Sequence, residues 1–235
     1  MPTFVDARRE AARAFFEFLH RQLTADDILS DRQCVRLLVE KAQREHAART
    51  RKRFDAEDTF RQKILYGKID DAVAQWCRKR DIGADPYAVF RFGGPERGPT
   101  QHETAIGPSL PNVRRAFERL AVAVPELNDC AGAVIRAPTR AIAPAFRLQH
   151  PLPFGAAGEV KFNGTRADLE RGVYQVAMYA ATGGDPSRSW RYDCGVLVLY
   201  GAERPRALLG EALFEAWPDV RERLWDAGRV WVLMI

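Results

Sequence analysis

The hydrophobic residues between positions 5 and 80 recur every three or four residues, which is the spacing of one helix face. Two such runs predict two helices, and Asp55 with Asp58 is typical of a capped start for a third. The apolar positions of the three segments are Ala12, Phe15, Phe16, Leu19 and Leu23; Val35, Leu38, Val39 and Ala42; and Phe60, Ile64, Val73, Trp76 and Cys77. We therefore expect a helical N-terminal region.

Glycine and proline punctuate residues 81–110, and this composition predicts a boundary or a long surface connection. Within the segment, Tyr87–Phe92 has the pattern of a short strand. We place a domain boundary here. The expected units are a helical region over residues 1–95, serving DNA contact, partner binding or dimerisation, and a second domain over residues 96–235.

After residue 110 the pattern alternates between helix and strand. A helix with Pro111 in its first turn comes first. The expected elements that follow are strands at 133–136, 144–149 and 158–162, a helix capped by Thr165 and closed by Gly183, a strand at 195–200, a helix at 207–225 and a strand at 229–235. This α-β-β-β-α-β-α-β order predicts an α+β (α/β) fold with a mixed sheet flanked by helices.

The charge pattern permits nucleic-acid binding without requiring it. The chain of 235 residues has a formal net charge of +5, and the densest basic cluster is Arg49, Arg51, Lys52 and Arg53. We take this cluster as a candidate nucleic-acid contact, with a solvated helix end as the alternative. The four cysteines form no C-x-x-C pair, so a zinc site is not predicted.

Several classes of protein receive no support from the sequence. No apolar run approaches the length of a membrane span, and the start of the chain lacks the pattern of a secretory signal. We therefore expect a cytoplasmic protein without a membrane partner. The chain also lacks a phosphate-binding P-loop, an H-E-x-x-H helix and a G-x-S-x-G turn.

One acid and one lysine carry the candidate chemistry. Glu159 and Lys161 are two residues apart on an expected strand, so both side chains project from one face while Val160 projects from the other. A carboxylate there could bind Mg²⁺, and the ammonium could position water or stabilise charge on a phosphate. The alternative is a salt bridge between neighbours on a surface strand.

The element order, with E-x-K on the third strand, resembles the PD-(D/E)xK (restriction-endonuclease-like) nuclease superfamily over residues 110–235. RecB-like members carry Q-x-x-x-Y on the next helix, and this sequence has Gln175 and Tyr179 there. The resemblance implies that Gln175 orients catalytic groups or substrate, and that Tyr179 packs beside them or touches the nucleic-acid backbone. Otherwise Tyr179 is a packing residue and Gln175 is incidental.

The resemblance also implies a metal site built on Glu159 and an aspartate of the second strand, where this chain has Ala145 after Pro144. Three alternatives would explain the alanine. The aspartate was changed to alanine by engineering, the site is naturally degenerate, or the ligand has migrated to another residue, of which Asp129 is the nearest upstream acid. Family members often add an acid from the helix before the sheet, for which Glu118 is the candidate. The backbone carbonyl of Val160 is a further implied ligand, and Mg²⁺, with Mn²⁺ as a substitute, is the implied cofactor.

Three functional hypotheses follow. The first is a metal-dependent DNA endonuclease, in a restriction or anti-phage setting, inactivated at Ala145, with DNA and either a second copy or a defence-complex subunit as partners. The second is a non-catalytic nucleic-acid-binding or assembly subunit with the same fold. The third is an unrelated α+β enzyme, in which Glu159, Lys161 and Gln175 would not converge in space.

Overall fold

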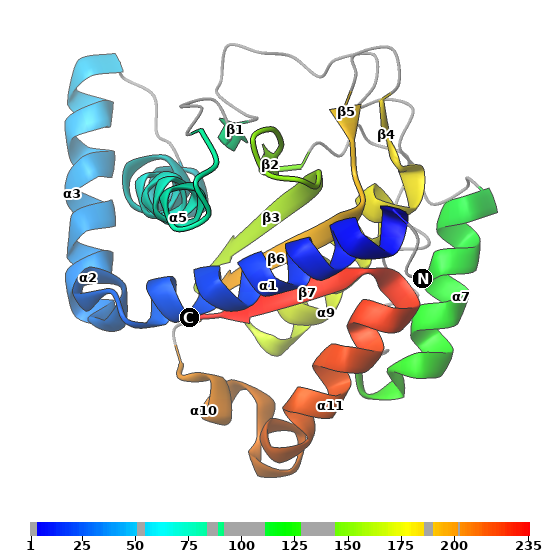
Figure 1. Ribbon diagram of the computed structural model, residues 1–235. Coiled ribbons are helices and arrows are strands. Elements are labelled where there is room, and N and C mark those ends of the chain that lie inside the picture. Colours follow the sequence, from blue (N-terminus) through cyan, green and yellow to red (C-terminus); the bar gives the residue numbers. More distant parts are fainter. Residues whose placement is uncertain are drawn as a thin grey trace.

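The computed structural model describes residues 4–50, 55–83, 89–91, 111–127, 144–185, 190–201 and 203–235. Within these ranges a five-stranded mixed sheet lies at the centre, with helices on both faces (Figure 1). The predicted α+β class, the sheet flanked by helices and the helical N-terminal region are therefore confirmed.

The strands of the central sheet lie side by side in the order β1-β2-β3-β6-β7. Their bounds are β1 (Val89–Arg91), β2 (Phe146–Leu148), β3 (Ala156–Phe162), β6 (Cys194–Tyr200) and β7 (Val230–Met234); a separate pair is β4 (Gly184–Asp185) with β5 (Trp190–Arg191). The first two pairings are antiparallel and the last two are parallel. Because β2 pairs only with residues 156–158, the C-terminal half of β3 extends beyond it.

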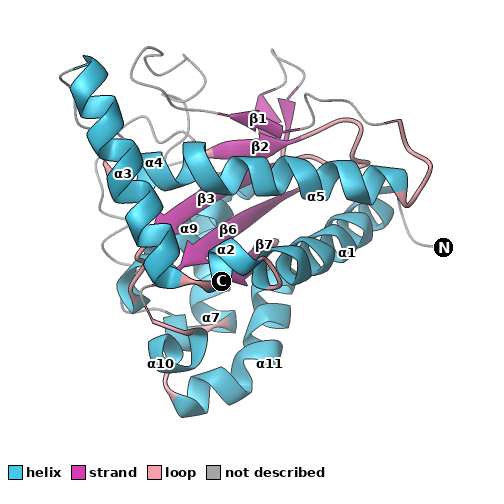
Figure 2. Cartoon of the chain, turned by 90° about the vertical axis from the view of Figure 1, so that its left-hand side faces the viewer, coloured by secondary structure: helices cyan, strands magenta, loops and turns pink. Residues whose placement is uncertain are grey.

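The N-terminal helices cover one face of the sheet. They are α1 (Phe4–Thr24), α2 (Asp27–Ser30), α3 (Arg32–Thr50), α4 (Ala56–Phe60), the π-helical turn η1 (Arg61–Leu65) and α5 (Tyr66–Arg78). As predicted, Asp55 caps α4, with its side chain accepting the Asp58 amide at 2.7 Å. Figure 2 shows α1 and α5 in front of the strands. Phe15 and Phe16 of α1 share one buried apolar cluster with Val160 of β3.

The opposite face carries α9 (Arg166–Thr182), flanked by α7 (Pro111–Ala123) and α11 (Glu211–Gly228), with η2 (Pro125–Leu127) and α10 (Pro205–Leu209) alongside. These helices and the sheet bury a second apolar cluster. α9 lies close to β6, since a Cβ added at Gly172 would be 2.7 Å from a methyl carbon of Leu197. A capping box of Thr165 and Asp168 starts α9.

Some expectations differ from the structure or fall outside it. The helix predicted at 207–225 is two helices, because Gly210 between them has φ +75°, which a continuing helix does not allow. The short strand predicted at Tyr87–Phe92 is present as β1 and joins the main sheet. The strand predicted at 133–136 and the boundary near residue 95 lie outside the described residues, so both stay predictions.

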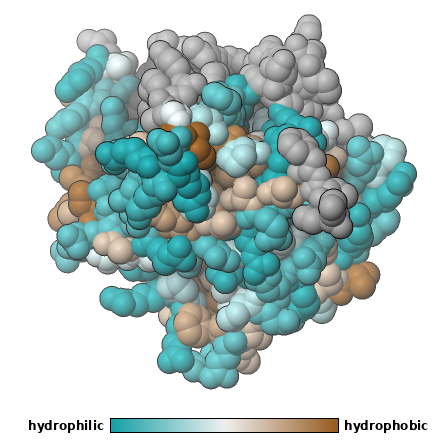
Figure 3. Space-filling view, in the orientation of Figure 1, coloured by the Kyte–Doolittle hydropathy of each residue, from teal (hydrophilic) through white to brown (hydrophobic). Residues whose placement is uncertain are grey.

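The outer surface over α1 and its neighbours is largely hydrophilic, with apolar residues in scattered places (Figure 3). Large exposed hydrophobic side chains of the described residues come from several helices: Val5, Ile28, Leu37, Leu38 and Val122. In the same part of the chain, no helix has both the length and the apolar character needed to cross a membrane.

Candidate active site

The E-x-K residues of β3 meet as alternation predicts. The Lys161 ammonium lies 3.2 Å from Glu159 Oε1, and the Glu159 side chain is 8% exposed while that of Lys161 is 14% exposed. Val160, between them, is buried in the cluster under the N-terminal helices. The pair is therefore not an exposed surface salt bridge, because its carboxylate is buried against α9.

Tyr179 of α9 holds the other oxygen of the same carboxylate. Its hydroxyl donates to Glu159 Oε2 at 3.3 Å, and the tyrosine has no exposed surface. Burial raises the pKa of the Tyr179 phenol well above its ordinary value, and the negative charge of Glu159 raises it further. Tyr179 is therefore a hydrogen-bond donor that orients Glu159, which goes beyond the packing role that the sequence left open.

Gln175 lies one helical turn before Tyr179 on the same side of α9. Because α9 runs back along β3 from its C-terminal end, Gln175 is displaced by about 6 Å toward the Lys161 end of the strand. Its Oε1 is buried and has no hydrogen-bond partner among the described residues. An unpaired buried amide oxygen costs about 1–3 kcal/mol, so a hydrogen-bond donor that reached Gln175 Oε1 would remove this cost.

Ala145 directly precedes β2, one residue beyond the Phe146–Gly158 pair. It is a bend residue, and it is buried in the apolar cluster under the N-terminal helices that also contains Val160. Ala145 is only 2% exposed, and its carbonyl accepts a hydrogen bond of 2.7 Å from the Tyr66 hydroxyl. Position 145 thus adjoins the end of the β2–β3 pairing, and the alanine methyl group offers no metal ligand.

Glu57 of α4 is a site residue that the sequence did not reveal. Its Oε2 accepts the backbone N–H of Phe162 at 3.4 Å, on the part of β3 that extends beyond β2. Burial raises the pKa of Glu57; the charge of Lys161 lowers it, and that of Glu159 raises it again. The charges of Glu159 and Lys161 therefore both influence the pKa of Glu57. The N-terminal helical region contributes directly to this site.

No hydrogen bond or ion pair of the described residues joins the remaining sequence candidates to this cluster. Glu118 is exposed on α7, and no hydrogen bond or ion pair among the described residues links it to Glu159 or Lys161. Arg49 is exposed in the last turn of α3, while residues 51–53 and Asp129 lie outside the described part of the chain. Within that part, no group of three or more His, Cys, Asp or Glu is placed to hold a metal ion.

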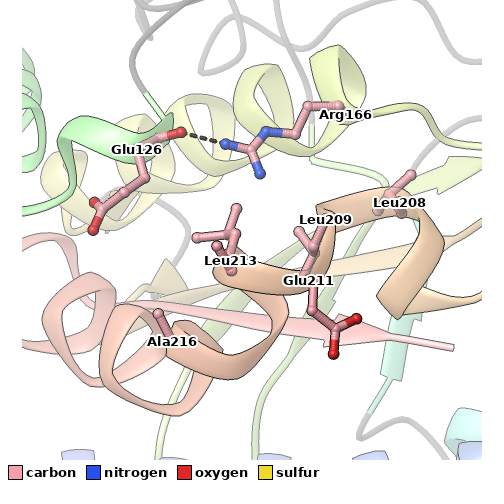
Figure 4. Close-up of a pocket in the computed structure, with 9 residues that line it drawn as sticks. Glu126, Arg166, Leu208, Leu209, Glu211, Leu213 and Ala216 are labelled. Carbon is pink, nitrogen blue, oxygen red and sulfur yellow. Dashed lines mark hydrogen bonds between the residues drawn. The ribbon is translucent and has the colours of Figure 1, made fainter.

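A separate pocket of about 490 Å³ lies between the start of α9 and the start of α11. Leu209 and Leu213 face it, and Arg166 closes one side by donating to the Glu126 carbonyl (Figure 4). Arg166 also pairs with Glu170 at 2.9 Å. The charged side chain of Arg166 is thus engaged within the protein, and none of the residues that line this pocket belongs to the E-x-K cluster.

Comparison of the chain with protein-family models, with curated proteins and with solved structures found no match in any of the three. The functional interpretation consequently rests on the geometry around Glu159.

Proposed function

We propose that this chain is a metal-dependent nuclease of the PD-(D/E)xK type that hydrolyses phosphodiester bonds in DNA. One observation carries the proposal: the buried Glu159 carboxylate is held between the Lys161 ammonium at 3.2 Å and the Tyr179 hydroxyl at 3.3 Å. The position of E-x-K on a central strand of the sheet, followed by a helix with Q-x-x-x-Y, supports it. The hypothesis of an unrelated enzyme turns on Gln175, and no hydrogen bond among the described residues joins Gln175 to Glu159 or Lys161.

The residues fit a Mg²⁺ site that lacks one carboxylate. Glu159 and Glu57 would hold the ion, with the side chain at position 145 as the third ligand, because Mg²⁺ prefers oxygen donors. When bound, the ion would neutralise phosphate charge and make water more acidic. Lys161 would orient the attacking water, and Tyr179 would fix the rotamer of Glu159. Gln175 Oε1, which has no partner among the described residues, would accept a hydrogen bond from that water or from a ligand.

Ala145 favours a second candidate function. With alanine at this position, the chain as it stands fits a nucleic-acid-binding or assembly subunit that retains the nuclease fold. Such a subunit would keep a substrate surface without cleavage. The two functions differ in one consequence: only the first predicts that an aspartate at 145 creates activity.

The test compares the chain with Ala145→Asp on plasmid, linear and single-stranded DNA, and on RNA, with Mg²⁺ or Mn²⁺. We expect cleavage of DNA by Ala145→Asp and none by the double variant Ala145→Asp/Lys161→Ala. Circular dichroism and a thermal melt establish that each variant is folded. A folded Ala145→Asp protein that cleaves nothing but still binds DNA would refute the nuclease proposal and support the binding subunit.

The role of Glu57 is tested against that of Glu118 by substituting each in the Ala145→Asp variant, which we expect to be active. Both are glutamates on helices, so Gln at either position removes one charge with little change in shape. We expect Glu57→Gln to lower kcat by at least tenfold and Glu118→Gln to leave it within about twofold. The reverse pattern would restore Glu118 as the acid from the helix before the sheet.

A further inference from the structure

Arg61 opens the π-helical turn that joins α4 to α5, four residues after Glu57. Such turns interrupt a helix and occur frequently at functional sites. The Arg61 side chain is 14% exposed, and one of its terminal nitrogens pairs with Asp58. This places a largely buried guanidinium on the same short segment as Glu57.

Part of that guanidinium has no partner. Its Nε is buried and makes no hydrogen bond within the described residues. The charge of Arg61 acts on two site groups, since it opposes the rise in the pKa of Glu57 and of Tyr179. Arg61 therefore has donor capacity that Asp58 does not use, on the segment that also carries Glu57.

The charges of the site explain why a second cation is needed there. Glu57 and Glu159 would repel a phosphate, and the Lys161 ammonium is already paired with Glu159. A guanidinium presents several donors in one plane and suits the oxygens of a phosphate better than an ammonium does. Arg61 is the residue of α4 and η1 that supplies such a group.

We propose that Arg61 binds a non-bridging oxygen of the substrate phosphate, so that the N-terminal helical region supplies part of the phosphate-binding site. That the phosphate belongs to a nucleic acid rests on the proposed function. The competing explanation is structural, with Arg61 serving only to pair with Asp58. A matched control is available, because Arg171 pairs with Asp168 at the same i,i+3 spacing on α9 but is 52% exposed.

The first experiment measures thermal stabilisation by inorganic phosphate at constant ionic strength. We compare the parent chain with Arg61→Gln, Arg61→Lys and Arg171→Gln, using chloride as the reference anion. Phosphate should raise the Tm of the parent and of Arg171→Gln, and the rise should be absent in Arg61→Gln. Equal rises in the parent and in Arg61→Gln, or no rise in either, would overturn the proposal.

The second experiment measures the anisotropy of a fluorescein-labelled 20-base-pair DNA in Ca²⁺ over a range of salt. Arg61→Gln should weaken binding about tenfold or more and reduce the salt slope by about one phosphate contact. Arg61→Lys, which keeps the charge, should retain the slope and recover part of the affinity. Arg171→Gln should match the parent. A folded Arg61→Gln protein with parental affinity and slope would assign Arg61 a structural role.

The two experiments separate failure of the inference from failure of the proposed function. Phosphate stabilisation that requires Arg61, together with absence of DNA binding and cleavage, would retain the phosphate site and reject the nuclease. DNA cleavage by Ala145→Asp that is unaffected by Arg61→Gln would retain the nuclease and reject Arg61 as a phosphate ligand.

Discussion

At the scale of single residues, close packing holds β2 and β3 in their antiparallel register. Gly158 faces the ring of Phe146 on β2, and a Cβ added at Gly158 would lie 2.2 Å from a ring carbon. Phe146 is itself fully buried. The ring has no free space into which to move, so the absence of a side chain at Gly158 is a requirement of the packing.

Gly158→Ala should therefore lower the free energy of unfolding by about 1–3 kcal/mol through overpacking. Gly67→Ala is the matched control, because Gly67 is exposed in α5 and has nothing within 4 Å of an added Cβ. That change should stabilise the chain by about 0.5–1 kcal/mol, since alanine favours a helix interior. Urea unfolding measures both, and equal effects of the two substitutions would contradict this account.

The sequence predicted the local part of the site and missed its long-range part. Alternation on a strand and i,i+4 spacing on a helix placed Glu159, Lys161 and Tyr179, because these relations depend only on nearby residues. Glu57 meets the strand through a contact that spans 105 residues. Glu57 is an acid in the first turn of a helix, and the helix dipole favours an acid there in any protein. Its local sequence therefore does not distinguish it as a site residue.

At the scale of elements, the start of α9 fixes where Gln175 and Tyr179 lie relative to β3. The Thr165 hydroxyl accepts the amide of Asp168, whose carboxylate in turn accepts the amide of Thr165 at 2.9 Å. This capping box begins the helix three residues after β3 ends at Phe162. A later start would rotate the helix and move both side chains around its axis.

Thr165→Ala removes the cap acceptor and should cost about 1 kcal/mol of unfolding free energy. Thr165→Ser keeps a hydroxyl at the same position and should stay within about 0.5 kcal/mol of the parent. Chemical denaturation with an unchanged m-value is the appropriate measurement. Equal destabilisation by Ala and Ser would mean that the Thr165 methyl group, rather than its hydroxyl, contributes the stability.

The strong elements were predictable because their signals are local and agree with one another. β3 and α9 have an apolar face of the right period and clear ends, and the structure shows both close to the predicted bounds. The division at Gly210 was missed, because the apolar pattern continues across it and the decisive quantity is a backbone angle. Glycine in a sequence permits a positive φ but does not require one.

At the scale of the whole molecule, the N-terminal helices and the sheet depend on each other. Leu19 and Trp76 of the helical region are buried in one cluster with Val160 and Trp231 of the strands. β1, which precedes residue 96, also provides the partner for the outer edge of β2. The helical region therefore acts as the cover for one sheet face as well as the source of Glu57.

A fragment of residues 96–235 should consequently fail to fold as a cooperative unit. It would expose the sheet face that α1 and α5 cover, together with an unpaired edge on β2. We expect strong binding of a hydrophobic dye, a broad thermal transition and loss of near-ultraviolet circular dichroism. Adding residues 1–95 as a separate chain should restore a sharp transition, because it returns the missing cover. A fragment that alone unfolds as sharply as the full chain, without dye binding, would instead establish residues 96–235 as an independent domain, with the helical region as an added module.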